Sequence, residues 1–177
     1  PVSSALATLN ESINGTSREF SQFRAYLSTN RPKRSRGDVN QAVGRAVREV
    51  LDLYPQVKAT VRVPDVAAVA SFNEMGLTAA VTNLVDNAVQ AVNGNGAVEV
   101  SVEQYPDQVQ IFIEDDGPGF PSELTGETIQ PFWSTKGQGF SGLGLSIAQW
   151  VAHEHGGNLR LGSTARGGAR AVLTLQR

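Results

Sequence analysis

Two asparagines stand four residues apart in a segment whose apolar residues recur with helical spacing. Residues 73–92 place one apolar stripe on a predicted helix, with Asn83 and Asn87 at its border; the stripe consists of Leu77, Val81, Leu84, Ala88 and Val92. Residues four apart share a helix face, so the two amides lie side by side. An amide oxygen suits Mg²⁺, which binds oxygen and takes few protein ligands. The pair predicts the wall of a polar cleft, although exposed asparagines on helices are also common.

A carboxylate follows at the end of an alternating apolar strand. Residues 108–115 deliver Asp115 to a turn that contains Gly117 and Gly119. Asp115 is placed to accept a hydrogen bond from the exocyclic amine of adenine. Guanine carries an oxygen at that position, and a buried charged acceptor left unpaired is costly, so the site would select adenine. The glycines let the backbone approach a ring. The other interpretation is an ordinary turn, because Asp-Gly and Pro-Gly are common turn dipeptides.

A glycine-rich segment at 137–145 runs directly into another predicted helix. Such a segment presents free N–H groups and the positive end of the helix dipole, which together bind anions such as phosphate. It is neither a P-loop nor a dinucleotide fingerprint, because it lacks Gly-Lys-Ser/Thr and no βαβ unit surrounds it. Just before it, Lys136 could reach a terminal phosphate, while Phe132 and Trp133 could anchor a lid or simply pack.

These motifs need elements that bring them together, and the hydrophobic pattern supplies them. It predicts a helix from the N-cap Asp38 to Pro55, a strand at 57–63, an apolar segment at 66–70, the helix at 73–92, a hairpin of strands 97–104 and 108–115, a loop or lid at 117–141, a helix at 142–154, and strands at 158–163 and 169–176. This order predicts an α+β two-layer sandwich, a mixed β-sheet with three helices on one face.

The first residues have a different organisation. Residues 1–29 carry a heptad stripe over about four heptads, which is typical of a helix packed on another helix. A helix lying on its own domain is the alternative. Residues 31–37 are basic and break the helix; a solvated hinge is favoured over a nucleic-acid-binding arm, because nothing aromatic is interleaved. We therefore divide the chain into a helix at 1–30, a linker at 31–37 and a domain at 38–177.

Composition narrows the class of protein. The 177 residues are 40% hydrophobic, with 15 basic and 17 acidic residues, so neither nucleic acid nor an acidic membrane attracts the whole chain. Cysteine is absent, which excludes disulfides, thiolate zinc and a thiol nucleophile and fits a reducing cytoplasm. No signal peptide or membrane-spanning apolar run is visible. Because the first residue is Pro1, we expect a fragment or a processed form, whose parent protein could be membrane-anchored.

The motifs, in this order, resemble the catalytic ATP-binding domain of sensor histidine kinases, which has the Bergerat fold of the GHKL superfamily. Four boxes and a tail carry the resemblance: the N box at 83–88, the first glycine box at 115–119, the F box at 131–136, the second glycine box at 142–147, and His155-Gly156-Gly157 before a strand. The resemblance covers residues 38–177 and looks closest to nitrogen-regulation-type kinases.

The resemblance implies ATP and Mg²⁺ as ligands and assigns their contacts. Asn87 would coordinate Mg²⁺, Asn83 would support the phosphates, and Asp115 would bind the adenine amine. Gly117 and Gly119 would border the base. The residues implied to close over the phosphates are Thr135, Lys136, Gly142, Leu143 and Gly144.

This sequence also departs from the family pattern. Many members have a basic and an aromatic residue where Gln90 and Ala91 stand here, which puts contacts from that helical turn in doubt. The second glycine box often begins Gly-Thr-Gly, whereas Phe140 and Ser141 stand before Gly142 here.

The same resemblance separates a kinase from an ATPase. Gyrase, heat-shock chaperone and mismatch-repair relatives hydrolyse ATP with a glutamate at the position of Asn83, and a neutral amide cannot act as a base. Asp86 does not substitute, because it lies about 100° around the helix from Asn87. We expect the site to keep water from ATP and to present the γ-phosphate to an acceptor. Catalysis would then rest on positioning by Asn83 and on neutralisation of charge by Mg²⁺ and Lys136.

The phosphoacceptor is expected outside this segment. The chain has two histidines, His153 and His155, and neither is favoured as the acceptor because both stand at a helix end before two glycines. The expected partners are a phosphoacceptor-histidine helix, a response regulator and a second copy joined through residues 1–29, with no nucleic acid. Two alternatives stay open: an anti-sigma-factor-type Ser/Thr kinase of the same fold, and a non-catalytic docking module.

Overall fold

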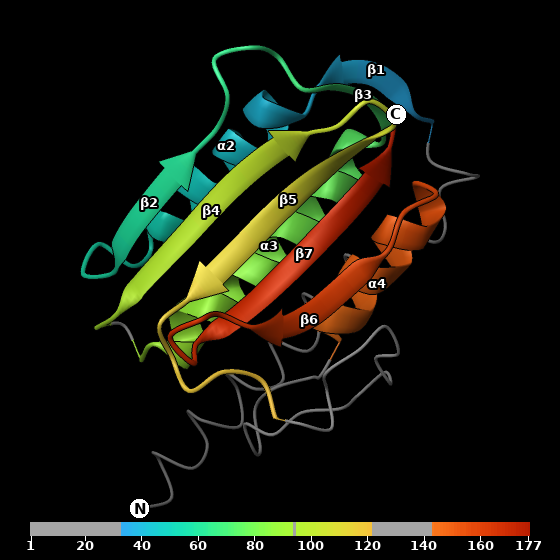
Figure 1. The fold of residues 1–177 in the computed structure, drawn as a ribbon. Helices are drawn as coiled ribbons and strands as arrows, with labels where there is room; N and C mark the ends of the chain where they lie inside the picture. Colours follow the sequence, from blue (N-terminus) through green and yellow to red (C-terminus); the bar gives the residue numbers. More distant parts are fainter. Residues whose placement is uncertain (1–32, 94, 122–142) are drawn as a thin grey trace, which may run out of the picture.

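The computed structural model describes residues 33–93, 95–121 and 143–177 (Figure 1). The predicted helix at 1–29 and most of the predicted lid lie outside the described residues. So do Phe132, Trp133, Thr135, Lys136 and Gly142. Over the ranges that are described, no helix has the length and apolar character needed to cross a membrane.

A five-stranded sheet carries three helices on one face (Figure 1). The strands run in the order β2-β4-β5-β7-β6, with β2 parallel to β4 and the other neighbours antiparallel. The strands of this sheet are β2 (Lys58–Arg62), β4 (Ala97–Gln104), β5 (Gln108–Asp115), β6 (Leu159–Ser163) and β7 (Ala169–Gln176), and the helices are α2 (Val39–Leu51), α3 (Glu74–Ala91) and α4 (Gly144–Glu154). The predicted two-layer sandwich with a mixed sheet is therefore confirmed.

The core lies between the helices and one face of the sheet. In β5 every second residue is buried, from Val109 through Ile111 and Ile113, and the alternate side chains face the open side. Burying one such aliphatic side chain contributes about 1.5–3 kcal/mol, so this alternation fixes which face of the sheet the helices cover. The predicted stripe of α3 is also buried, from Leu77 to Val92.

A second, two-stranded sheet was not predicted from the sequence. β1 (Ser35–Asp38) pairs antiparallel with β3 (Val69–Phe72), which places a strand within the segment interpreted as a linker at 31–37. The sequence does not reveal β1, because its residues are small or charged and its pairing uses the backbone. β3 begins three residues after the start of the apolar segment predicted at 66–70. The division of the chain at 30 and 37 stays a prediction.

β2 confirms the strand predicted at 57–63. Val61 in this strand and Val63 just after it are 42% and 40% exposed. β2 is the edge strand, paired on one side only with β4. The apolar alternation therefore predicted the strand, and its place at an edge of the sheet accounts for the exposed valines. At the other end of this region, Asp38 caps α2 as predicted, accepting a hydrogen bond of 3.0 Å from the backbone N of Asn40.

Candidate functional site

Asp115 is a buried carboxylate at the end of β5. It continues the buried series of that strand, so it lies on the helix-covered face, and it is only 8% exposed. Its Oδ1 accepts hydrogen bonds from the backbone N of Gly117 at 2.9 Å and of Ala169 at 3.3 Å. Two backbone amides therefore fix the orientation of this carboxylate. The neighbouring Asp116 is exposed and accepts from the backbone N of Ala97 at 2.8 Å, so the two acidic residues have different roles.

Glycines let three loops approach one another around Asp115. A Cβ on Gly117 would lie 3.1 Å from the carbonyl oxygen of Ala91 at the end of α3. Gly119 has φ +79°, and a Cβ there would lie 2.7 Å from the carbonyl oxygen of Gly167. The first glycine box is therefore bounded by the end of α3 and by the β6–β7 turn, in a space that larger residues would fill.

Gly168 is a residue of this site that the sequence reasoning missed. A Cβ on Gly168 would lie 1.8 Å from the carbonyl oxygen of Asp115, so only glycine fits between β5 and β7 at this point. The adjacent Ala169 supplies one of the amides that hold the Asp115 carboxylate. The Gly-Gly pair in a predicted hairpin was the available signal, but the sequence gives no way to know which carboxylate it would meet.

Asn83 and Gly144 bring the N box against the second glycine box. The side-chain amide of Asn83 donates to the carbonyl oxygen of Ala79 at 2.9 Å, and its Oδ1 lies 3.2 Å from the position of a Cβ on Gly144. α4 begins at Gly144, after the buried Leu143. Within the described residues, no side chain caps this helix and no acidic residue stands in its first turn. Such a helix start presents its N–H groups and positive dipole end to an anion.

One wall of the site runs along α3, from the start of α4 to the turn that follows Asp115. Asn83 contacts the start of α4, Asn87 follows one turn later, and Ala91 contacts the turn after Asp115. At 1.5 Å per residue, the eight residues from Asn83 to Ala91 span about 12 Å, a distance that a nucleotide laid along the helix can bridge. Figure 1 shows the loop after β5 and the beginning of α4 at the same end of the sheet. The structure thus gathers the described members of the predicted site.

Asp86 belongs to a different contact. Its Oδ1 accepts from the hydroxyl of Tyr54 at 3.2 Å, and its Oδ2 accepts from the side-chain amide of Gln90 at 2.6 Å. Burial and the Asp86 carboxylate raise the pKa of Tyr54 above its ordinary value. Asp86 therefore points toward the segment after α2, and Gln90, one of the departures from the family pattern, is bonded to it.

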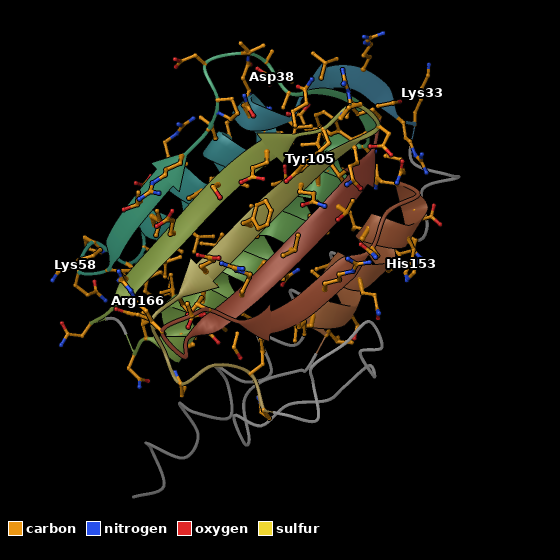
Figure 2. The ribbon with its side chains drawn as sticks, in the orientation of Figure 1. Lys33, Asp38, Lys58, Tyr105, His153 and Arg166 are labelled. Atoms are coloured by element: carbon orange, nitrogen blue, oxygen red, sulfur yellow. The ribbon has the colours of Figure 1, made fainter. Side chains whose placement is uncertain are left out.

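The two histidines are placed differently. Figure 2 shows His153 on the surface at the end of α4 remote from the site. His155 is 1% exposed, and its ring nitrogens lie 2.9 Å from the backbone N of Asn73 and 2.6 Å from the carbonyl oxygen of Val151. A buried ring with both nitrogens engaged is not available to attack a phosphate. The structure thus offers no role for His155 as a phosphoacceptor.

The donor set suits a cation of the Mg²⁺ type. Among the residues that the structure describes, no three His, Cys, Asp or Glu side chains gather into a metal site. Mg²⁺ does not require such a cluster, because it keeps several waters and uses few protein ligands beside substrate phosphates. The half-buried Asn87, one helical turn after Asn83 on α3, provides one amide oxygen of the right kind. The site therefore fits a magnesium–phosphate group better than a metal held by protein alone.

Comparison with known proteins decides the family. A family model described as "Histidine kinase-, DNA gyrase B-, and HSP90-like ATPase" matches residues 72–177, more than half of the chain. The chain belongs to this ATPase family. The resemblance of the boxes and the nucleotide-binding nature of the fold are thereby confirmed, with ATP as the nucleotide that names the family.

Curated relatives of this ATPase domain include a nitrogen regulation protein and a sensor histidine kinase. The nitrogen regulation protein NtrY of Azorhizobium caulinodans is 28% identical over 96% of this chain and 23% of its own length. The sensor histidine kinase GtrS of Pseudomonas aeruginosa is 39% identical over 58% of this chain and 21% of its own. The chain thus spans less than a quarter of the length of either relative.

Solved structures agree with the fold. The mycobacterial sensor histidine kinase MprB has a TM-score of 0.72 at 26% identity, covering 81% of this chain and 97% of that one. The ATP-binding domain of PrrB from Mycobacterium tuberculosis has a TM-score of 0.67 at 28% identity, with the same coverage. In both cases almost the whole of the solved chain is accounted for by this ATPase fold.

Proposed function

We propose that this ATPase-family domain is the catalytic domain of a sensor histidine kinase, which transfers the γ-phosphate of ATP to a histidine outside this segment. One observation carries the proposal. Along the α3 wall from Asn83 to Ala91 the single carboxylate is Asp86, and it is bonded to Tyr54 and Gln90. Asn83, which lies against the start of α4, is a neutral amide that cannot take a proton from water, and Asp86 is directed toward Tyr54 and Gln90. Sensor histidine kinases among the relatives support the same conclusion.

The residues have distinct roles in holding the nucleotide. The oriented Asp115 carboxylate accepts a hydrogen bond from the adenine amine, and Gly117 and Gly119 leave room for the ring. Asn83 and the N–H groups at the start of α4 face the phosphates. Asn87 would hold Mg²⁺ through its amide oxygen, and the ion would supply neutralisation of phosphate charge.

The roles proposed for further residues rest on the resemblance of the sequence to the kinase family. Thr135, Lys136 and Gly142 are proposed to close over the phosphates together with Leu143 and Gly144, and they lie outside the described residues. The proposed partners are a phosphoacceptor-histidine helix, a response regulator, and a second copy joined through residues 1–29. The histidine acceptor comes from elsewhere in the protein, because His155 is buried with both ring nitrogens engaged and the exposed His153 lies at the end of α4 remote from the site.

Asp115→Asn tests the nucleotide site. The new Asn Oδ1 can still accept from Gly117 and Ala169, so the loop keeps its bonds while the carboxylate charge is lost. Titration calorimetry with Mg²⁺ and a non-hydrolysable ATP analogue should show at least about 10–100-fold weaker binding, the cost of losing a charged hydrogen bond. Asp116→Asn is the matched control, because this exposed side chain accepts from the backbone N of Ala97, which the new Asn Oδ1 can also do, and the variant should bind as the wild type does. Equal affinity for the Asp115→Asn variant would refute the adenine assignment.

Phosphate chemistry tests the kinase assignment. The domain, joined to the segment that precedes it in the full protein, should yield a phosphorylated product that acid hydrolyses, as expected for a phosphorus–nitrogen bond. An acid-stable phosphoserine on a partner protein would instead favour the anti-sigma-factor-type kinase. Steady ATP hydrolysis by the isolated domain would contradict the argument from the α3 wall. The isolated Asn87→Ala variant should lose Mg²⁺-dependent ATP binding, measured by the same calorimetry.

A further inference from the structure

His155 connects the end of α4 to the beginning of α3. The backbone N–H of Asn73 donates to its Nε2 at 2.9 Å, so Nε2 carries no proton. The proton of the neutral ring is then on Nδ1, which donates to the carbonyl oxygen of Val151 at 2.6 Å. The ring is buried and both nitrogens are used, one by each helix. This arrangement requires the neutral imidazole in a single tautomer.

The partner of His155 is the residue that starts α3. Asn73 is the N-cap of that helix, and its side chain accepts from the backbone N of Gly76 at 2.7 Å. The carbonyl oxygen of His155 also accepts from the backbone N of Gln176 in β7 at 3.1 Å. One residue therefore ties the cap of α3, the end of α4 and the last strand.

The two helices that carry the site run antiparallel and pack along their length, with one described contact at each end. His155 contacts Asn73 at one point, and Gly144 lies against Asn83 at the other. Ten residues separate the two contacts on α3 and eleven separate them on α4, which correspond to about 15 Å and about 16 Å. Because the spacings on the two helices are nearly equal, the remote contact and the site contact are both formed in the same register of α4 on α3.

We propose that His155 is a positioning residue that sets the register of α4 on α3 and thereby holds Gly144 against Asn83. The inference rests on the proposed function only in assigning the Asn83 end to ATP. A proton on Nε2 would place a donor against the Asn73 N–H, so acid breaks the contact.

The surroundings oppose protonation of this ring. Burial lowers the pKa of His155 below its ordinary value. The charged groups that act on the ring are Arg34, before β1, which lowers its pKa, and Glu154, on α4, which raises it. α3 and β7 bring the uncharged Asn73 and Gln176 to this residue. The neutral form is therefore the one that the fold holds at ordinary pH.

A pair of variants separates the two bonds of the ring. His155→Gln places an amide oxygen near the position of Nε2 and can still accept from Asn73. His155→Asn is shorter by one methylene, reaches only toward Val151, and loses that acceptor. His153→Gln, at the exposed histidine two residues earlier, is the matched control. The readouts are hydrogen exchange of the Asn73 amide without nucleotide, and calorimetric affinity for a Mg²⁺–ATP analogue.

The expected pattern is specific. At about pH 7.5, His155→Asn should exchange the Asn73 amide faster and bind the analogue about tenfold more weakly, while His155→Gln stays within about threefold of the wild type. As the pH is lowered from about 7.5 through the lowered folded-state pKa of His155, the wild type and His153→Gln should lose more affinity than His155→Gln, in which residue 155 does not titrate.

Three results bear on the proposal in different ways. Faster Asn73 exchange in His155→Asn with unchanged ATP affinity would overturn it, since the contact would then not govern the site. Should His155→Asn fail to fold, a loss of affinity that is identical in the wild type and in His155→Gln as the pH falls through the folded-state pKa of His155 would overturn it. If the wild type binds no ATP, the proposed function fails, while the exchange measurements still decide whether His155 holds the cap of α3.

Discussion

The two ends of the α3–α4 pair differ in the contacts that join the helices. At the remote end, the backbone N of Asn73 and the carbonyl oxygen of Val151 engage both nitrogens of the buried His155 ring. At the site end, Gly144 stands where a side chain would crowd Asn83, and no described side chain caps α4. The difference shows one helix pair with a closed contact that holds it together and a second contact shaped to receive an anion.

Close-packed glycines occur at both ends, which makes the comparison testable. A Cβ on Gly157, just after α4, would lie 1.8 Å from the carbonyl oxygen of Thr174. A Cβ on Gly168 would lie 1.8 Å from the carbonyl oxygen of Asp115. In both places the obstacle is backbone, which cannot move aside as a flexible side chain does, so both glycines are required by the fold.

The largest effects are expected from alanine at these two glycines. Gly157→Ala and Gly168→Ala should each lower the free energy of unfolding by about 3 kcal/mol or more, because a methyl group would overlap a backbone carbonyl. Urea unfolding followed by circular dichroism measures the change. Gly162→Ala is the control, because its Cβ would meet nothing within 4 Å. A change in Gly168→Ala as small as in the control would contradict the described packing of β5 on the β6–β7 turn.

The next effect separates ligand binding from stability. In Gly144→Ala, the new Cβ would lie 3.2 Å from Oδ1 of Asn83, which must shift slightly. Alanine also favours the helix by about 1 kcal/mol over glycine, so the free energy of unfolding should change by no more than about that amount. Calorimetry should nevertheless show several-fold weaker binding of the Mg²⁺–ATP analogue. Equal losses of stability and affinity would mean that the site end is as much a structural contact as the remote end.

Much of this architecture could be predicted because the spacing of apolar residues within each segment indicates a helix or a strand. Alternation of apolar residues predicted β5 and the position of Asp115 at its end. Helical spacing predicted that Asn83 and Asn87 lie on one side of α3. What could not be predicted depends on contacts between distant segments. Gly168 matters because β7 passes against β5, and β1 forms by backbone pairing that its side chains do not reveal.

The remaining site residues mark the limit of the sequence evidence. Thr135, Lys136 and Gly142 keep the roles that the resemblance implies, as predictions. The role of His155 illustrates the opposite case: its position before two glycines was noted, but its bond to Asn73 joins residues 82 positions apart. The order of the motifs was therefore sufficient to identify the family, whereas the contact of His155 with Asn73 could be found only in the three-dimensional structure.

A smaller effect is expected from acid at the remote end. The pKa of His155 is lowered in the folded protein, so below about pH 6.5 the unfolded chain binds a proton that the folded chain does not. Stability contributed by the neutral ring is therefore present above that pH and is lost as the pH falls. Urea unfolding at several pH values should show a shallower acid loss for His155→Gln than for the wild type or His153→Gln. Parallel curves for all three proteins would show that this ring does not govern acid stability.

The smallest effect is expected on the open face of the sheet, which faces the viewer in Figure 2. A concavity of about 760 Å³ lies there, away from Asp115, and it is lined by residues that include Arg62, Glu99, Tyr105 and Glu114. Arg62 pairs with Glu99 at 3.0 Å, with side chains 69% and 37% exposed, and exposed pairs of this kind contribute about 0–1 kcal/mol.

Glu99→Gln should therefore change the free energy of unfolding by less than about 0.5 kcal/mol. The variant loses the ion pair with Arg62, but Glu99 also stands directly opposite Glu114, and like charges in that position are destabilising. The two changes oppose each other, so urea unfolding and ATP affinity should both match the wild type. A loss above about 1 kcal/mol would show that this charged face contributes stability comparable to the helix-covered one, and would narrow the contrast between the regions that hold the fold and those that face solvent.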